Sequence, residues 1–523
     1  MTKYVLNRLI RGILSVAVML VIVMVMIFTL MDRQLIFAAD PVFSKRTNNA
    51  KTTYQYSKWE EYGYLDYVTY ADYLTQLTKS GEIDEATRAD AVKLGRTPEK
   101  DSALTKEYVE KFTQYYTARG YAVTRLDTVM NGRKVANGGQ AALFAAKDKP
   151  IWDRAIHYFT GILEFDNIHY VQEDIGERKL TFTLYDPMYG GEKFSPAIMG
   201  NGTYHKYLLY FDSKFPYIHQ NFLTLHLGKS FVVNQGIDVF DTMTASQGAY
   251  IPTQITYPTG LTEQSADDLH TATYVPGSLQ AGEVLYGARY TDDYTQTSTF
   301  KGGMSKMGYS FLFGVLSVIL AYLIGLPLGV WMALKADKLV DKIGTFYIVF
   351  ITAVPSLSYI FMVKTIGYAL KIPTTFDLES TNKMMYLLPI ISLAMPSIAR
   401  LMRWMRRYMI DQKNSDYVKF ARSNGLTEGE IFSKHIMRNA VVPIVQGIPA
   451  SVLFSLVGAF YTERVYAIPG TGGLMVTAIQ TYDNNVIVGI CLFYGLLSVV
   501  SLILGDVMMA AVDPRISFNT KAR

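Results

Sequence analysis

The stretch DYVKFARSNGLTEGEIFSKHIMRNAVVP, residues 416–443, lies between two apolar segments and carries the strongest helix signals in the chain. Residues 416–424 are predicted to form one short helix. Gly425 ends it, because glycine adopts the left-handed backbone of a helix C-cap without steric cost. Thr427 and Glu430 then form a capping box, in which each side chain satisfies a backbone donor of the next helix. The stretch is therefore predicted to fold as helix, glycine turn, helix.

Two interpretations of this stretch are open. It is either an amphipathic connector on the lipid headgroups, or a coupling element whose two short helices dock in a groove of a cytoplasmic motor. The spacing of Ala421 and Gly425 favours the coupling element. Arg422, Lys434 and Arg438 would then pair with acidic side chains of the motor. Solvated charges at a basic membrane surface are the alternative for each of them.

Half of the 523 residues are hydrophobic, and much of this content is gathered into long runs typical of a membrane protein. The first run is longer than the core of a signal peptide and has no small-residue cleavage site after it, so we expect it to be retained. Six spans are predicted, at residues 12–31, 307–334, 343–363, 385–402, 440–461 and 486–511.

Basic residues set the expected orientation, because Lys and Arg are retained on the cytoplasmic side of a membrane. With six spans, the basic clusters at both termini and at 335–342 and 403–438 all fall on one side. The chain is therefore expected at the cell membrane with both termini in the cytoplasm. This orientation predicts three parts. Residues 1–31 contain the cytoplasmic N-terminus and the first helix, and residues 32–303 form an extracellular domain. Residues 304–523 contain the remaining helices, with a cytoplasmic coupling loop at 403–439.

Residues 32–303 form a large insert with about 33 acidic and 27 basic side chains, so its net charge is roughly −6 against roughly +11 for the remainder. Its first half is predicted to be helical, at 81–95, 98–120 and 150–165. Its second half is rich in β-branched and aromatic residues and is predicted to form strands, so the insert is expected to be α+β. The predicted strands lie at 180–186, 204–212 and 272–277.

Prolines and a few charges stand out within the predicted spans. A proline removes a helical hydrogen bond, and in lipid the freed carbonyl needs a neighbouring helix or a water-filled path. Kinks that improve packing explain any single proline, whereas several together favour a bundle around a passage that changes shape. Arg400 and Asp506 both lie near the inner side, and one hypothesis pairs them with each other. The prolines are Pro327, Pro355, Pro389, Pro396, Pro443 and Pro449.

The 416–443 stretch resembles the EAA loop of ABC-importer permeases, in the version found in bacterial di- and oligopeptide permeases. Lys419-Phe420-Ala421 stands in place of the generic Glu-Ala-Ala. The nearest resemblance is to the enlarged Ami/Opp-type permease of Gram-positive oligopeptide importers, and it covers roughly half of the chain. The matching residues are Asp416-Tyr417-Val418, Ala421-Arg422, Gly425-Leu426, His435, Arg438-Asn439-Ala440, Gly325-Leu326-Pro327-Leu328-Gly329, Asp341, Leu227-Gly228-Lys229-Ser230, Glu463, Pro469-Gly470, Asp506 and Asp513-Pro514-Arg515.

The resemblance implies a membrane α-helical fold, with six transmembrane helices of the ABC type I importer permease class and the α+β insert between the first two. It implies a permease subunit that forms half of the pathway for oligopeptide uptake. Such a subunit is not an enzyme and holds no cofactor, because ATP and Mg bind to partner ATPases. The implied partners are a second permease, two cytoplasmic ATPases, an extracellular lipid-anchored peptide-binding protein, oligopeptide and membrane lipid, without nucleic acid.

Individual residues are expected to have roles in three groups, with none in catalysis or metal binding. Residues for coupling to the ATPases are Asp416, Ala421, Arg422, Gly425, Leu426, Thr427, Glu430, Lys434 and Arg438. Residues for structure or gating within the spans are Pro327, Pro355, Pro396, Pro443, Pro449 and Asp506. Residues of external loop elements are Gly228, Ser230, Glu463, Pro469 and Gly470.

Other functions fit the sequence less well. An ABC-type mechanotransmission protein usually has four spans, and a surface receptor needs only one. A secondary transporter more often carries charges at the middle of the membrane. Leu227-Gly228-Lys229-Ser230 is not a phosphate-binding loop, because Leu223 occupies the position of its first glycine. The histidines show neither HExxH nor paired metal-ligand spacing.

Overall fold

A computed structural model describes most of the chain and leaves out several segments of the insert and the C-terminal end. The described residues are 2–95, 97–126, 129–130, 133–134, 143–165, 167–168, 170, 178–185, 194, 196–200, 203, 207–211, 216–218, 223–249, 253–256, 262–265, 267–273, 296–299 and 303–512. Asp513-Pro514-Arg515 therefore lies outside them.

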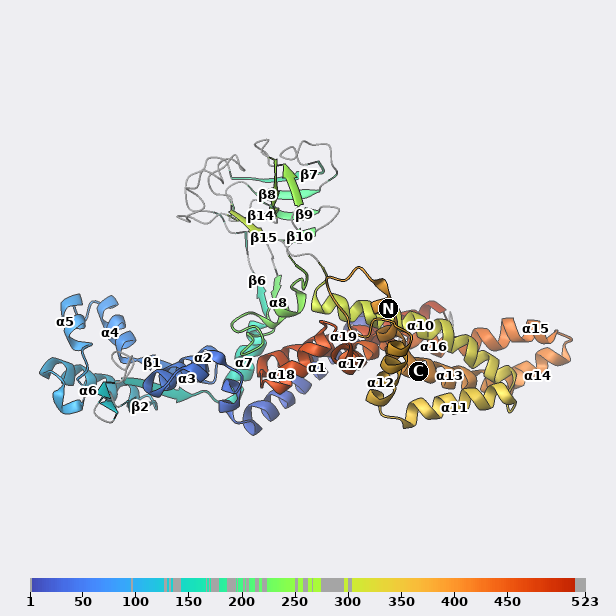
Figure 1. Cartoon of the computed structure of the whole chain (residues 1–523), viewed down its shortest axis with the longest axis horizontal. Helices are drawn as coiled ribbons and strands as arrows, with labels where there is room; N and C mark the ends of the chain where they lie inside the picture. The colour runs from blue at the N-terminus through green and yellow to red at the C-terminus, as the bar shows by residue number, and fades with distance from the viewer. Residues whose placement is uncertain are drawn as a thin grey trace.

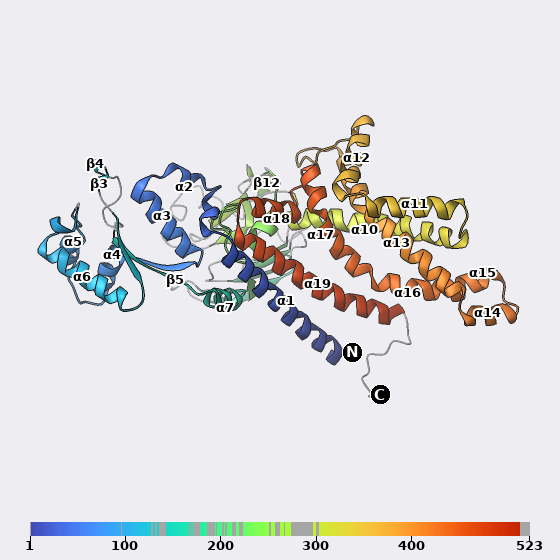
Figure 2. The ribbon, with the colours of Figure 1, turned by 90° about the horizontal axis from the view of Figure 1, so that it is seen from below.

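A bundle of long helices forms one part of the molecule (Figures 1 and 2). Among the described residues, four helices are long and apolar enough to cross a membrane, and the total is up to six if each of two bent helix pairs is one span. This confirms the predicted α-helical membrane fold. The elements of the bundle are α1 (Thr2–Leu30), α10 (Lys306–Leu334), α11 (Leu339–Ala353), α12 (Ser356–Ala369), η6 (Lys383–Tyr386), α13 (Leu387–Lys413), α14 (Asp416–Ser423), α15 (Glu428–Glu430), the π-helix η7 (Ile431–Met437), α16 (Arg438–Gln446), α17 (Ile448–Tyr466), α18 (Thr471–Gln480) and α19 (Asn484–Val512).

The third predicted span is broken rather than continuous. α11 and α12 meet at an angle of 113°, where the sequence predicted one helix over 343–363. Pro355 has an extended backbone with ψ 139°, and Val354 before it has ψ 131°. Proline lacks an N–H, and it also disfavours helical geometry in the residue before it. The helix therefore ends at Ala353 and restarts in a new direction.

α10 and α13 pack closely because α10 carries Gly325 and Gly329 four residues apart. A Cβ atom on Gly325 would lie 3.0 Å from Cβ of Leu401, and one on Gly329 would lie 2.8 Å from Cβ of Met405. Small residues at this spacing let two membrane helices approach each other. Pro327 lies between the glycines, and α10 continues through it.

The first half of the insert contains the predicted helices and also a sheet that the sequence analysis missed. Strands β1, β5 and β2 form a three-stranded antiparallel sheet in that order. β5 is alanine-rich, and therefore gave little strand signal. The elements are η1 (Arg33–Phe37), α2 (Pro41–Lys45), α3 (Asn48–Glu61), β1 (Leu65–Thr69), α4 (Tyr70–Lys79), α5 (Glu85–Ala91), η2 (Pro98–Lys100), α6 (Ala103–Thr117), β2 (Ala122–Arg125), β3 (Val129–Met130), β4 (Arg133–Lys134) and β5 (Leu143–Asp148).

The second half of the insert is largely stranded, as predicted, and its strands β7–β10, β14 and β15 lie in a separate lobe in Figure 1. Its four-stranded sheet has the order β10-β9-β8-β7. The helix predicted over 150–165 ends early, because residues 163–165 form a strand that pairs with β11. The elements are α7 (Ile151–Gly161), β6 (Leu163–Phe165), β7 (Leu180–Thr183), β8 (Ala197–Gly200), β9 (Tyr207–Phe211), β10 (Pro216–Ile218), β11 (Leu223–Leu225), α8 (Val239–Thr244), β12 (Thr253–Thr256), β13 (Thr262–Ser265), β14 (Asp267–Thr273) and β15 (Gln296–Thr299).

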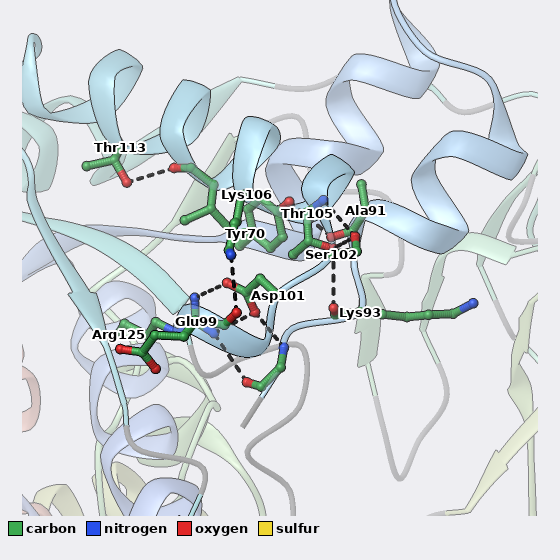
Figure 3. Close-up of polar contacts among 12 residues, drawn as sticks. Tyr70, Ala91, Lys93, Glu99, Asp101, Ser102, Thr105, Lys106, Thr113 and Arg125 are labelled. Carbon is green, nitrogen blue, oxygen red and sulfur yellow. Dashed lines mark hydrogen bonds and ion pairs between the residues drawn. The ribbon is translucent and has the colours of Figure 1, made fainter. Parts of the chain in front are cut away.

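A buried ion pair holds the helical lobe of the insert together (Figure 3). Arg125 donates to both carboxylate oxygens of Asp101, at 2.6 and 2.9 Å, and the Gly95 N–H donates to the same carboxylate at 2.6 Å. Burial alone would raise the pKa of Asp101. The hydrogen bonds from Arg125 and Gly95 outweigh burial and hold this pKa below its usual range.

Asp101→Asn is expected to destabilise this lobe by about 3 kcal/mol at neutral pH, because it leaves the partly buried Arg125 without its carboxylate partner. Since the pKa of Asp101 is lower in the folded state, the wild-type contribution is present above the unfolded pKa and is lost as pH falls through the folded value. Hydrogen exchange of α6 in the full-length protein measures both effects. Asp90→Asn removes only an exposed pair with Lys93 and is the control. Equal exchange in both variants would contradict the prediction.

Candidate functional site

Segment 416–443 folds as helix, glycine turn, helix at one end of the bundle, while the insert extends from the other end (Figures 1 and 2). α14 ends at Ser423, and Gly425 has the left-handed backbone with φ +81°. Thr427 accepts a hydrogen bond from the Glu430 N–H, and the Glu430 side chain accepts one from the Thr427 N–H. The predicted glycine stop and capping box are therefore confirmed. Residues 403–413, expected in the loop, are the last turns of α13.

The second helix of this segment differs from the prediction in its winding. After one turn of α15, residues Ile431–Met437 form a π-helix before α16 begins. Ser433 donates to the Gly429 carbonyl at 2.8 Å inside this stretch. π-Helical turns are rare and often mark functional positions. No residue pattern in the sequence distinguished it from an α-helix.

The two short helices present one face to the bundle and one outward. Val418, Ala421 and Ile431 are buried in the main hydrophobic core, with exposed fractions of 5% or less. Phe420 points outward and is 67% exposed. Leu426 packs against the same core. The buried face fixes the segment to α13, while Phe420 remains available.

Most charged residues of the segment pair with one another. Arg422 binds the carboxylate of Glu428 across the glycine turn, at 2.6 and 3.1 Å, and Lys434 lies 3.5 Å from Glu430. Lys419 binds Asp416 at 2.9 Å. These pairs are exposed, so each contributes little to stability. Arg438 is exposed, and the described part of the chain supplies it with no ion pair.

A buried ion pair supports this end of the bundle. Asp341 at the start of α11 is 3% exposed. Arg406 of α13 donates to its two oxygens at 2.5 and 2.7 Å, and the Asp337 N–H donates to it at 2.9 Å. The pair joins the α10–α11 turn to the part of α13 that leads into α14.

Arg406→Gln is expected to lower the free energy of unfolding by about 3 kcal/mol, because Asp341 is left buried without its cation. The neighbouring Arg407→Gln is the matched control. Arg407 pairs with Asp411 at 3.8 Å with both side chains largely exposed, so its loss should cost at most about 1 kcal/mol. Thermal unfolding of the detergent-solubilised protein compares the two. Indistinguishable midpoints would show that the buried pair contributes no more than the exposed one.

At the opposite end, the stretch 227–233 joins the insert to the bundle. The Ser230 hydroxyl donates to Asp483 at 2.6 Å, and the next three backbone N–H groups donate to the same carboxylate at 2.9, 2.9 and 3.0 Å. Gly228 has φ +91°. A Cβ atom there would lie 3.4 Å from Asn485. Asp483 is fully buried and was missed by the sequence analysis.

Glu463 was predicted to belong to an external loop. It lies instead inside α17 and is 1% exposed. It accepts hydrogen bonds from the Ser310 hydroxyl at 2.6 Å and from the Gly473 N–H at 2.8 Å. A Cβ atom on Gly470 would overlap its carboxylate, at 2.2 to 2.4 Å. The position after Pro469 therefore requires a glycine, because the Glu463 carboxylate lies so close to it. Through its two hydrogen bonds, Glu463 ties α17 to α10 and α18.

Asp506 and Arg400 do not pair, so that hypothesis is wrong. Asp506 is held by α1, through Arg8 at 2.9 Å and the Tyr4 hydroxyl at 2.9 Å. The contact falls between helices far apart in sequence, and α1 and α19 run side by side in Figure 2. Arg400 instead lies near Ser397 and the ring of Phe454.

The prolines fall into two structural groups. Pro355 lies at the 113° break, and Pro449 follows the 43° bend between α16 and α17. Pro327, Pro396 and Pro443 lie inside helices that continue through them. A role in gating stays a prediction for all five.

Comparison with known proteins finds a matching family model and several similar proteins. A family model described as the binding-protein-dependent transport system inner membrane component matches residues 325–518. The oligopeptide transport system permease protein AmiC of Streptococcus pneumoniae, strains TIGR4 and R6, is 31% identical, with 100% of this chain and 99% of AmiC aligned. The dipeptide transport system permease protein DppB of Bacillus subtilis is 30% identical, and the alignment covers 40% of this chain and 68% of the length of DppB.

Among solved structures, a chain from an amino acid ABC transporter is 16% identical. It covers 40% of this chain and 92% of its own length, with a TM-score of 0.32. The alignment with AmiC includes the insert as well as the bundle, whereas that with DppB leaves most of the chain unmatched.

Proposed function

The chain belongs to the Ami/Opp-type permease family of binding-protein-dependent transporters, and we propose that it forms half of the membrane pathway of an importer for oligopeptides. The observation that carries this proposal is the full-length similarity to AmiC, which is named an oligopeptide transport permease. The relatives are permease proteins and not enzymes, so the chain contributes a pathway and coupling rather than chemistry.

The partners follow from this role. A second, related permease would complete the pathway, and two cytoplasmic ATPases would bind and hydrolyse ATP with Mg. An extracellular lipid-anchored binding protein would deliver peptide to the insert. The two-ended architecture supports this arrangement, because the segment 416–443 and the insert lie at opposite ends of the bundle.

We place segment 416–443 and both termini in the cytoplasm and residues 32–303 outside the cell. The basic residues Arg403, Arg406 and Arg407 lie in the half of α13 that leads into this segment, and such residues are retained on the cytoplasmic side.

In the proposed transporter, the segment transmits the closure of the ATPases to the membrane-spanning helices. The capping box and the glycine stop define its two helices and the turn between them. Its buried face joins it to α13. Phe420 would fill an apolar pocket on an ATPase, as buried aromatic anchors do at protein interfaces.

The test combines uptake with assembly. Cells lacking this chain should fail to import a labelled mixed peptide pool, and the wild-type chain should restore import. Phe420→Ala should weaken co-purification of the ATPases at least about tenfold. Phe346→Ala, which removes a 71% exposed ring from α11, is the control and should leave association unchanged. Restored co-purification without any peptide import would favour a mechanotransmission or receptor role instead.

A further inference from the structure

Arg400 places a positive charge within the predicted span 385–402, toward the inner end that leads to Arg403, Arg406 and Arg407. It lies near the centre of the 27 residues of α13, between Ala399 and Leu401, which are both buried. Its own side chain is exposed. A charge within a span is costly against lipid unless it reaches the headgroups, so an arginine that instead opens into a cavity of the protein is a candidate for binding.

Nothing in the described part of the chain neutralises this charge. No carboxylate lies within ion-pair distance of Arg400 there. Its contacts are the Ser397 hydroxyl at 3.4 Å and the face of the Phe454 ring at 5.7 Å. Asp506, the acid expected to pair with it, is held by Arg8 and Tyr4. Apart from the long hydrogen bond to Ser397, the guanidinium therefore keeps its donors for a group that is not part of this chain.

Arg400 opens into a cavity of about 220 Å³ between α10, α13, α16 and α17. The cavity lies over Gly447, at the bend between α16 and α17. At its inner wall, the Tyr322 hydroxyl lies 3.4 Å from the Ser451 hydroxyl. The side chains that surround Arg400 are Tyr322, Trp404, Tyr408, Pro443, Ser451 and Phe454.

Another face of the bundle has the opposite character. The groove between α10, α11 and α13 is lined almost entirely by apolar groups, among them Ile324, Leu328 and Ile343. Exposed residues beside it, such as Phe346, are also apolar. This face suits acyl chains, whereas the mixed aromatic and polar face around Arg400 does not.

We propose that the Arg400 face lines the translocation path and that Arg400 binds the C-terminal carboxylate of a passing peptide. The inference rests on the proposed function. Every linear peptide carries one such carboxylate whatever its sequence, and a guanidinium binds it through two parallel hydrogen bonds. The cavity is smaller than the roughly 300–1,000 Å³ of a site that holds a whole ligand. It therefore accepts one end of a peptide, with the rings of Trp404 and Phe454 beside the last side chain.

The test uses the complete reconstituted transporter and two versions of one labelled peptide, with a free or an amidated C-terminus. The wild-type preference for the free acid should fall at least about tenfold in Arg400→Gln, because one charged hydrogen-bond partner is lost. Arg400→Lys should retain part of the preference. The binding protein is the same in all arms, so a change in the ratio belongs to the permease. Arg403→Gln, one turn further on α13 with its guanidinium 3.0 Å from Thr352, should leave the ratio unchanged.

Three results would overturn the inference. An equal fall in import of both peptides by Arg400→Gln, with assembly intact, would show a role that does not involve the carboxylate. Loss of the second permease from purified Arg400→Gln would show that an acid of that subunit is the partner. An unchanged ratio would exclude contact with the peptide end. Failure of the wild-type transporter to import either peptide would instead overturn the proposed function, and the inference with it.

Discussion

Gly425→Pro is expected to abolish peptide uptake and ATPase association while the chain still inserts into the membrane. Gly425 has φ +81°, and proline is fixed near φ −65°. Proline also lacks the N–H that Gly425 donates to the Arg422 carbonyl at 3.1 Å. The turn therefore cannot form, and Thr427 loses its place as the cap of the next helix. Uptake of a labelled peptide pool and co-purification of the ATPases measure the two losses.

Two milder substitutions serve as controls for this result. A Cβ atom at position 425 meets nothing within 4 Å, so Gly425→Ala should cost only the left-handed strain, about 1–2 kcal/mol, and lose part of the uptake. Gly429 has equal space and no left-handed backbone. Gly429→Ala should keep full activity, since alanine favours helix. Normal uptake by Gly425→Pro with the ATPases attached would show that the segment is only a connector.

The sequence predicted this segment well where local chemistry decides the structure. A glycine stop and a capping box involve residues a few positions apart, so Gly425, Thr427 and Glu430 were sufficient. The π-helix after Glu430 was not predictable, because it depends on how Ile431 and Ile436 fit the core. Periodicity likewise located the spans but not the 113° break, although Pro355 marked where it could occur.

Residues whose roles depend on distant partners were missed or misplaced. Glu463 looked like an outer-loop residue, since a carboxylate seldom lies inside an apolar helix. Its partner Ser310 lies 153 positions away. The Arg400–Asp506 pairing failed because α1 competes for Asp506 through Arg8. Depth along a helix can be read from a sequence, but the rotation of one helix against another cannot.

Asp483 was missed for the same reason. Its sequence context is an ordinary polar turn, and its partners lie about 250 positions away. Its carboxylate accepts the Ser230 hydroxyl and the N–H groups of Phe231, Val232 and Val233. Asp483→Ala would leave four donors without an acceptor in a buried site. At about 1–3 kcal/mol for each unsatisfied group, the expected loss is about 4 kcal/mol or more.

The expected result of Asp483→Ala is therefore release of the 227–234 stretch from the bundle, with a lower unfolding temperature and no uptake. Limited proteolysis of the solubilised protein should show new cleavage in that stretch. Asp483→Asn keeps one acceptor oxygen but puts an NH₂ group toward the donors, so it should lose slightly less stability. Asp377→Asn, an exposed turn carboxylate with one backbone partner at 3.0 Å, should match wild type. If Asp483→Ala resisted protease as well as Asp377→Asn, the insert would be held by its apolar contacts with α1 and α19, and the carboxylate would be dispensable.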